Sequence, residues 1–432
     1  MDKVSRLKRL PLQVAGTLVV STILGWTPPA LAREPVPPST PAVATPTTSK
    51  LLDLAACRSL ALEHQPTIAA YKASLEASNV ANEALNNIGL AGLLVHDLPV
   101  RRDQAALGNQ IAQSRVRQAE LEATYAVTRT YLLLLYARQQ QDLLDKTLID
   151  LRDLRDTVKQ IVDDGLRPDI TTRDLERLNL LVILAEGRRE EALDGQERAK
   201  AALREAMGFG AEFTFDVVGR VLPYPKDKFT KQQIVDLALS KRNEIVQATT
   251  AAEIFCLEVK AQGLSRHPKA NTFASAADLH AQPVPQGLED GEYRPGAVGP
   301  EMPATLAGNR SERMQQASAY HERAQAVAQK ARNLVTLEAE DAFFRWKDAN
   351  NKTSSLLEAA DKAEKLGRDL REDFKTPGAK VKLDEVLLTG ILAGQMRGQA
   401  NDSIRDLAMI LGSLERITAG GVSIDFSVKP KP

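Results

Sequence analysis

Acidic side chains gather just before two turn signals in this chain. Asp163 and Asp164 precede Gly165, and three more carboxylates precede Pro377-Gly378, namely Asp369, Glu372 and Asp373. Carboxylates that line a narrow passage concentrate cations and repel anions. The same charges can also do no more than keep the end of a helix solvated. The five residues are therefore candidate pore or gating groups, with the solvated helix end as the open alternative.

The turn signals are of the kind that ends one helix before another begins. Glycine tolerates the left-handed backbone conformation that follows many helices, and proline cannot continue a helix because it lacks a backbone N–H. We therefore predict two helix-to-helix tips, built on Gly165, Pro168, Pro377 and Gly378.

The chain also contains two similar halves. An Ala-Leu phrase opens a long Ala-rich segment at Ala61 and again at Ala238, 177 positions later, while Gly165 and Gly378 are 213 positions apart. Duplication on this scale indicates two similar structural units that share one role. Chance similarity between Ala-rich helices is the alternative.

Composition indicates a mainly α-helical protein without a charge bias. Lys plus Arg equals Asp plus Glu at 56 each, so no net basic field would attract nucleic acid, and aromatic residues make up only 4%. Between Gln104 and Asp164 no Pro occurs, and apolar residues recur at three- and four-residue spacing, which predicts a helix about 90 Å long. Further helices are predicted over about 172–207, 234–264, 312–373 and 382–417, with a short strand or turn within 208–219. A plain coiled coil would give the same periodicity.

The N-terminus has the pattern of an export signal. A basic leader is followed by an apolar run from Leu12 to Trp26 and by the small residues Ala30-Leu31-Ala32, which predicts a cleaved signal peptide over 1–32. An uncleaved membrane anchor is the less favoured alternative, because the run is shorter than a membrane span. Residues 33–50 are rich in Pro, Ser and Thr, and should form a flexible tether.

Residues that could support catalysis or metal binding are scattered. The histidines form no closely spaced pair, and the chain lacks a nucleophile elbow and a phosphate-binding glycine loop. Cys57 and Cys256 lie in different halves without a C-x-x-C neighbour, so lone buried thiols are favoured over a disulfide. We therefore expect no enzyme activity, no cofactor and no metal site.

Taken together, these features resemble the TolC-like outer-membrane efflux factors. The match rests on the signal peptide, the two repeats and the two tips, of which Pro377-Gly378 followed by Leu383-Asp384-Glu385-Val386-Leu387 is the better match. It divides the chain into a first repeat over 51–222, a second over 223–418 and a tail over 419–432. The resemblance implies two repeats of long antiparallel helices that form a TolC-like α-helical barrel in the periplasm, below a β-barrel in the outer membrane. It also implies a passive channel for small molecules or polypeptides in a tripartite efflux or type I secretion system. Its partners would be two further copies, a periplasmic adaptor, an inner-membrane pump and outer-membrane lipid. Three copies around one axis would turn any inward carboxylate at the tips into a ring.

One departure from the family concerns the strand segments between the long helices. In the first repeat only 86–100 is available for two strands, which is short, whereas the second repeat has 266–310, an insert that is rich in Pro and Gly. We therefore expect a short or partly lost β-barrel portion, with membrane attachment through the second repeat. The alternatives are a non-conducting periplasmic helical-hairpin scaffold or adaptor-like protein, and an extended coiled-coil surface protein.

Overall fold

The computed structural model describes residues 50–88, 95–165, 167–266, 268–273, 302–376 and 380–426. The chain divides into two units, Met1–Thr47 and Thr48–Pro432, and the described residues all belong to the second. The predicted signal peptide and nearly all of the tether lie outside them. The same is true of Pro377 and Gly378, of 89–94 within the predicted strand segment 86–100, and of most of the segment 266–310.

Helices dominate the described part of the chain, which confirms the mainly α-helical prediction. They are α1 (Leu54–His64), α2 (Pro66–Asn86), α3 (Leu98–Asp164), α4 (Thr172–Ala206), α5 (Lys231–Lys241), α6 (Asn243–Leu264), α7 (Arg310–Lys375) and α8 (Leu383–Ile417). The strands are short: β1 (Lys50–Leu52), β2 (Phe215–Val217), β3 (Lys269–Asn271) and β4 (Thr305–Ala307). In this part of the chain, no helix is both long enough and apolar enough to cross a membrane.

The two structural repeats have nearly the same helix lengths. Helices α1 to α4 contain 11, 21, 67 and 35 residues, and α5 to α8 contain 11, 22, 66 and 35. Helices α1 and α5 begin 177 residues apart (54 and 231), whereas α3 and α7 begin 212 apart (98 and 310). The extra length of the second repeat therefore lies between α6 and α7.

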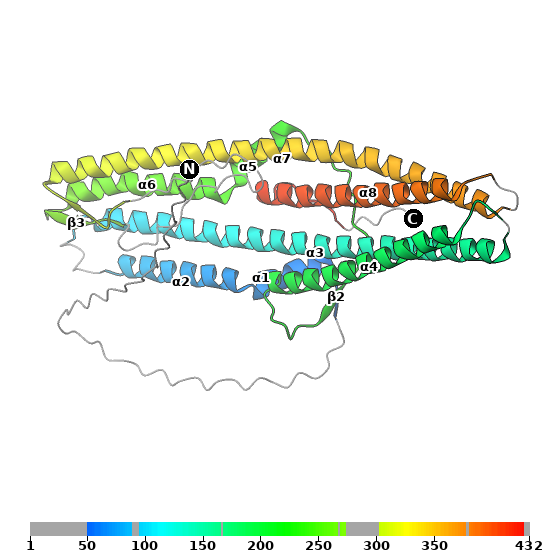
Figure 1. The fold of residues 1–432 in the computed structure, drawn as a ribbon. Helices are drawn as coiled ribbons and strands as arrows, with labels where there is room; N and C mark the ends of the chain where they lie inside the picture. The colour runs from blue at the N-terminus through cyan, green and yellow to red at the C-terminus, as the bar shows by residue number, and fades with distance from the viewer. Residues whose placement is uncertain are drawn as a thin grey trace, which may run out of the picture. The chain divides into compact units, whose positions relative to one another are not determined.

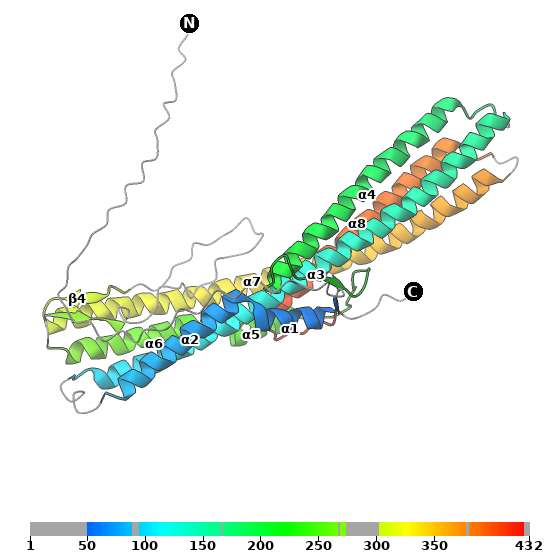
Figure 2. The same cartoon turned by 90° about the horizontal axis from the view of Figure 1, so that it is seen from below.

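The two long helices, α3 and α7, each run past several shorter ones. Helix α3 packs against α2 and α6 in one half and against α4 and α8 in the other, while α7 packs against α6 and α8. Figures 1 and 2 show α2 and α6 along one half of the long helices and α4 and α8 along the other half. Helix lengths near 67 residues correspond to about 100 Å each. The predicted pattern of long antiparallel helices in two repeats is confirmed.

A short helix break separates α1 from α2 and α5 from α6. Pro66 supplies the first break, because proline removes a helical hydrogen bond and keeps Gln65 extended (φ −65°, ψ 117°). The second break falls at Arg242 (φ −63°, ψ 128°) without any proline or glycine. The single helix predicted over about 234–264 is therefore wrong. The physical reason for the break is a buried ion-pair network: the Arg242 guanidinium binds Glu244 bidentately and reaches Glu338 on α7 at 2.7 Å.

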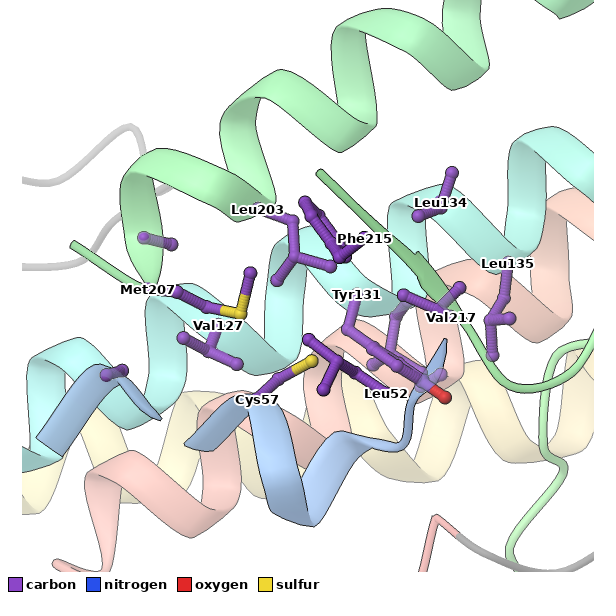
Figure 3. Close-up of a cluster of buried hydrophobic side chains, with 14 of the residues drawn as sticks. Leu52, Cys57, Val127, Tyr131, Leu134, Leu135, Leu203, Met207, Phe215 and Val217 are labelled. Carbon is purple, nitrogen blue, oxygen red and sulfur yellow. The ribbon is translucent and has the colours of Figure 1, made fainter. Parts of the chain in front are cut away.

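The central core lies where these breaks meet the long helices. Strands β1 and β2 form a parallel pair with Leu52 beside Val217. Arg138 of α3 donates hydrogen bonds to the backbone carbonyls of Val217, in β2, and of Gly219, in the turn after it. The surrounding apolar side chains come from β1, α1, α3, α4 and β2 and point toward one another (Figure 3). This packing places the predicted short strand within 208–219 against the middle of α3.

Both cysteines are free, but only one of them is buried. Cys57 is fully enclosed in the central core, whereas Cys256 lies on the exposed face of α6. The predicted burial of Cys57 is confirmed, and the predicted burial of Cys256 is wrong. The local sequence of α6 is apolar on several faces, so only its packing against α3 and α7 determines which face is exposed.

Gly208 fixes the junction between α4 and the first helix break. Its φ is +85°, and a Cβ atom there would lie 2.5 Å from the carbonyl oxygen of His64. We expect Gly208→Ala to lower the free energy of unfolding by about 2 kcal/mol or more, because backbone strain and a backbone clash add. Gly187→Ala is the control, since Gly187 faces open space and should gain about 0.5–1 kcal/mol in helix stability. Urea unfolding followed by circular dichroism measures both, and equal stability of the two variants would contradict the account.

Candidate functional site

The end of the molecule formed by the α3–α4 and α7–α8 connections is the candidate site. Gly165 ends α3 in the left-handed conformation (φ 64°), and its N–H donates to Val162. Helix α4 then begins with a capping box between Thr171 and Asp174. This tip is built from residues that satisfy the free backbone groups at helix ends.

The five predicted pore acids lie at this end but do not come together in a cluster. Asp163 and Asp164 close α3, and the other three occupy the last two turns of α7. All five side chains are exposed, and among the described residues none of them forms an ion pair. Their role in a pore stays a prediction.

An apolar cluster joins the two tips instead. Val158 and Leu178 of the first repeat pack with Phe374 and Val386 of the second. The guanidinium of Arg167 stands 5.1 Å from the centre of the Phe374 ring and donates to the Val381 carbonyl at 3.0 Å. Cation–π and hydrogen-bond contacts of this kind fix the orientation of the two tips relative to each other.

Ion pairs extend this contact along the long helices. Arg371 of α7 lies 2.5 Å from Asp150 of α3, and Lys375 lies 2.5 Å from Asp153. The sequence interpretation singled out the acids of α7 and missed these bases beside them, although both occur in the same two turns. Because the pairs are partly exposed, each contributes little to stability, but together they hold α3 beside α7.

Between the two helix pairs lies a cavity of about 420 Å³. Apolar side chains of α3, such as Leu143 and Leu151, form one wall, and three glycines of α8 form part of the opposite wall: Gly390, Gly394 and Gly398. A Cβ atom at any of the three would meet no other atom within 4 Å. Packing within the chain therefore does not require these glycines. We name this cavity the tip groove. The G-x-x-x-G spacing of these glycines is visible in the sequence, but it did not enter the prediction of the site.

Charged groups at the border of the tip groove are held in their ionised forms. Burial alone would raise the pKa of Glu364, but hydrogen bonding and charge from Arg397 outweigh it, so the pKa of Glu364 is lowered. Arg397 binds Glu364 at 2.8 Å and Asp361 at 2.6 Å, which fixes α8 against α7. The groove thus has apolar and glycine walls and a fixed, charged border. Such a surface suits the docking of a helix, since glycine faces allow helix backbones to approach closely.

Comparison with solved structures identifies the fold. The outer-membrane channel OprN superposes with a TM-score of 0.66 at 13% identity, covering 85% of this chain and 90% of that chain. The MtrE outer membrane channel of Neisseria gonorrhoeae in its open state gives 0.63 at 15% identity (85% and 89%). The CmeC outer membrane channel of Campylobacter jejuni gives 0.61 at 11% identity (88% and 90%). No protein-family model and no curated protein matches the sequence. The described chain therefore has the TolC-like fold of outer-membrane efflux channels, as the resemblance of its repeats and tips implied.

Proposed function

We propose that this protein is the outer-membrane channel component of a tripartite efflux or type I secretion system, a passive duct for small molecules or polypeptides. The observation that carries the proposal is the match of 85–88% of this chain to proteins described as outer-membrane channels. Energy for transport would come from a pump in the inner membrane.

A homotrimer is part of the proposal because α4 and α7 of one chain each leave apolar side chains uncovered. Helix α4 packs chiefly against α3, and three of its large apolar side chains are more than 60% exposed: Leu180, Ile183 and Leu184. On α7, at the other edge, Leu366 is 52% exposed. Apolar edges of this kind are typical of association surfaces. Two further copies would join α7 of one protomer to α4 of the next and close a ring.

The tip groove is the proposed docking site for a helix of a periplasmic adaptor. Its glycines leave space that the chain itself does not use, and its charged border would fix the register of the incoming helix. The adaptor would then sit at the end of the helices opposite β3 and β4 (Figures 1 and 2).

Envelope fractionation, oligomer size in detergent and single-channel recording together test the proposal. We expect the protein in the outer-membrane fraction, as a trimer that conducts ions in a planar bilayer. A soluble periplasmic monomer without conductance would overturn the proposal and favour the helical-hairpin scaffold.

The acidic residues of α7 give a prediction about conduction. If they face the axis of the trimer, neutralising all three with Asp369→Asn, Glu372→Gln and Asp373→Asn removes nine charges from one mouth. Cation selectivity should then fall severalfold, since a ring of carboxylates concentrates cations. Reversal potentials in a salt gradient measure this change. The matched control neutralises Glu190 and Glu191 on α4, away from the tip. Unchanged selectivity would show that the three acids do no more than keep the helix end solvated.

A further inference from the structure

A second pocket lies at the end of the helices opposite the tips. It has a volume of about 450 Å³ and is formed where α6 ends and α7 begins, with a contribution from the residues before α3. Its lining comprises His96, Gly263, Leu264, Ser265, Arg266, Pro268, Asn309, Arg310 and Arg313. The size lies within the range of small-molecule sites, roughly 300–1,000 Å³.

The lining contains three arginines and no carboxylate. Arg313 is only 1% exposed, and among the described residues its guanidinium donates to neutral oxygens: the carbonyls of Gly308 and Ser265 and both oxygens of Gln262. Its positive charge is therefore buried without an opposite charge in contact. A charge in this position is weakly screened and raises the electrostatic potential of the pocket.

The other two arginines add to this potential. Arg266 and Arg310 are exposed, and within the described part of the chain neither side chain has an ion-pair partner. Of the described carboxylates at this end, Glu312 accepts from the backbone N–H of Asn309 at 2.7 Å, and Glu258 binds Arg101 at 2.6 Å.

We propose that this basic pocket binds the phosphate of an anionic phospholipid headgroup, with Arg266 and Arg310 as its mobile donors and Arg313 as the fixed charge behind them. The lipid, as opposed to free phosphate, rests on the proposed function, because an outer-membrane channel places this end of the helices at the inner face of that membrane. Basic pockets at such boundaries bind phosphate headgroups. Leu264 is 41% exposed at the pocket and offers a contact for the glycerol backbone and acyl chains.

The test uses the full-length protein purified in a non-ionic detergent, titrated with phosphatidylglycerol and followed by native mass spectrometry. We expect Arg266→Gln/Arg310→Gln to bind the lipid about 30-fold more weakly, at about fivefold per arginine. Arg332→Gln is the matched control, because Arg332 is an exposed arginine of the same helix, far from the pocket. The control should bind like the wild type. Equal affinity of the double variant and the wild type overturns the proposal.

A second arm separates the two sources of phosphate. Inorganic phosphate at the same concentration should not displace the lipid, and displacement would overturn the lipid assignment. The oligomer and fractionation measurements are made on the same preparations. A wild type that is neither trimeric nor in the outer membrane, yet binds phosphatidylglycerol through these arginines, supports the pocket and contradicts only the channel function.

Discussion

Replacing Arg242 with alanine is expected to lower the free energy of unfolding by about 3–5 kcal/mol. Arg242 is 5% exposed, and it binds two buried carboxylates, Glu244 at 2.6 Å and Glu338 at 2.7 Å. Removing the guanidinium takes away the bidentate partner of Glu244 and leaves Glu338 with Arg416 at 3.0 Å. The substitution also removes the contact that holds the α5–α6 junction against α7, which is the Arg242–Glu338 pair.

The stability lost in Arg242→Ala should become smaller as the pH falls. Burial by itself would raise the pKa of Glu244, but the hydrogen bonds and charge of Arg242 outweigh it, so that this pKa lies below the ordinary value of 4.5. A lowered pKa in the folded state adds stability above that ordinary value, and the contribution is lost as the pH falls through the folded-state pKa. The difference between wild type and Arg242→Ala should therefore be full at pH 7 and should shrink below about pH 4.5.

Urea unfolding at pH 7 and pH 4 measures both parts of this prediction. Arg177→Ala is the control, because Arg177 is exposed and its pair with Asp384 at 3.2 Å should contribute less than about 1 kcal/mol. Replacing Arg242, Glu244 and Glu338 together by methionine should cost far less than the single alanine substitution, since both buried carboxylates leave with Arg242 and Arg416 keeps Glu122 at 3.4 Å. A loss below about 1 kcal/mol for Arg242→Ala would contradict the network.

Filling the tip groove is expected to abolish coupling to the adaptor. Gly394→Leu places a large side chain where the proposed partner helix docks, and overpacking of this kind costs about 1–3 kcal/mol at each site. A trimer carries three grooves that act together, so assembly of the complex should fall by more than about 100-fold. Folding should not suffer, because a Cβ atom at this position meets nothing within 4 Å.

Photo-crosslinking in the native cell measures this effect. A photoreactive amino acid at Gln395, an exposed residue of the groove, should cross-link a periplasmic protein in the wild type and not in Gly394→Leu. Gly195→Leu is the matched control, because Gly195 is also a helical glycine that faces open space, but it lies outside the groove. Export of a fluorescent dye should be lost in Gly394→Leu and should stay at the wild-type level in Gly195→Leu. A cross-link from residue 395 to a second copy of the chain would show that the groove belongs to the trimer interface instead.

Local signals in the sequence determined the helical framework. The breaker-free run from Gln104 to Asp164 predicted most of α3, and Gly165 marked its end, because periodicity and helix-ending residues act within a few turns. The spacing of the Ala-Leu phrases, 177 residues, equals the offset between α1 and α5. The repeats, the mainly α-helical class and the TolC-like fold follow from features of this kind.

Tertiary structure decided everything that depends on partners far along the chain. The break at Arg242 has no local signal, since it depends on Glu338, 96 residues away. The tip groove requires the glycines of α8 to face leucines of α3, and the basic pocket requires the end of α6 to meet the start of α7. A sequence shows which residues share a helix face, but the face that becomes buried, and the charges left without a partner, are set by the packing of the other helices.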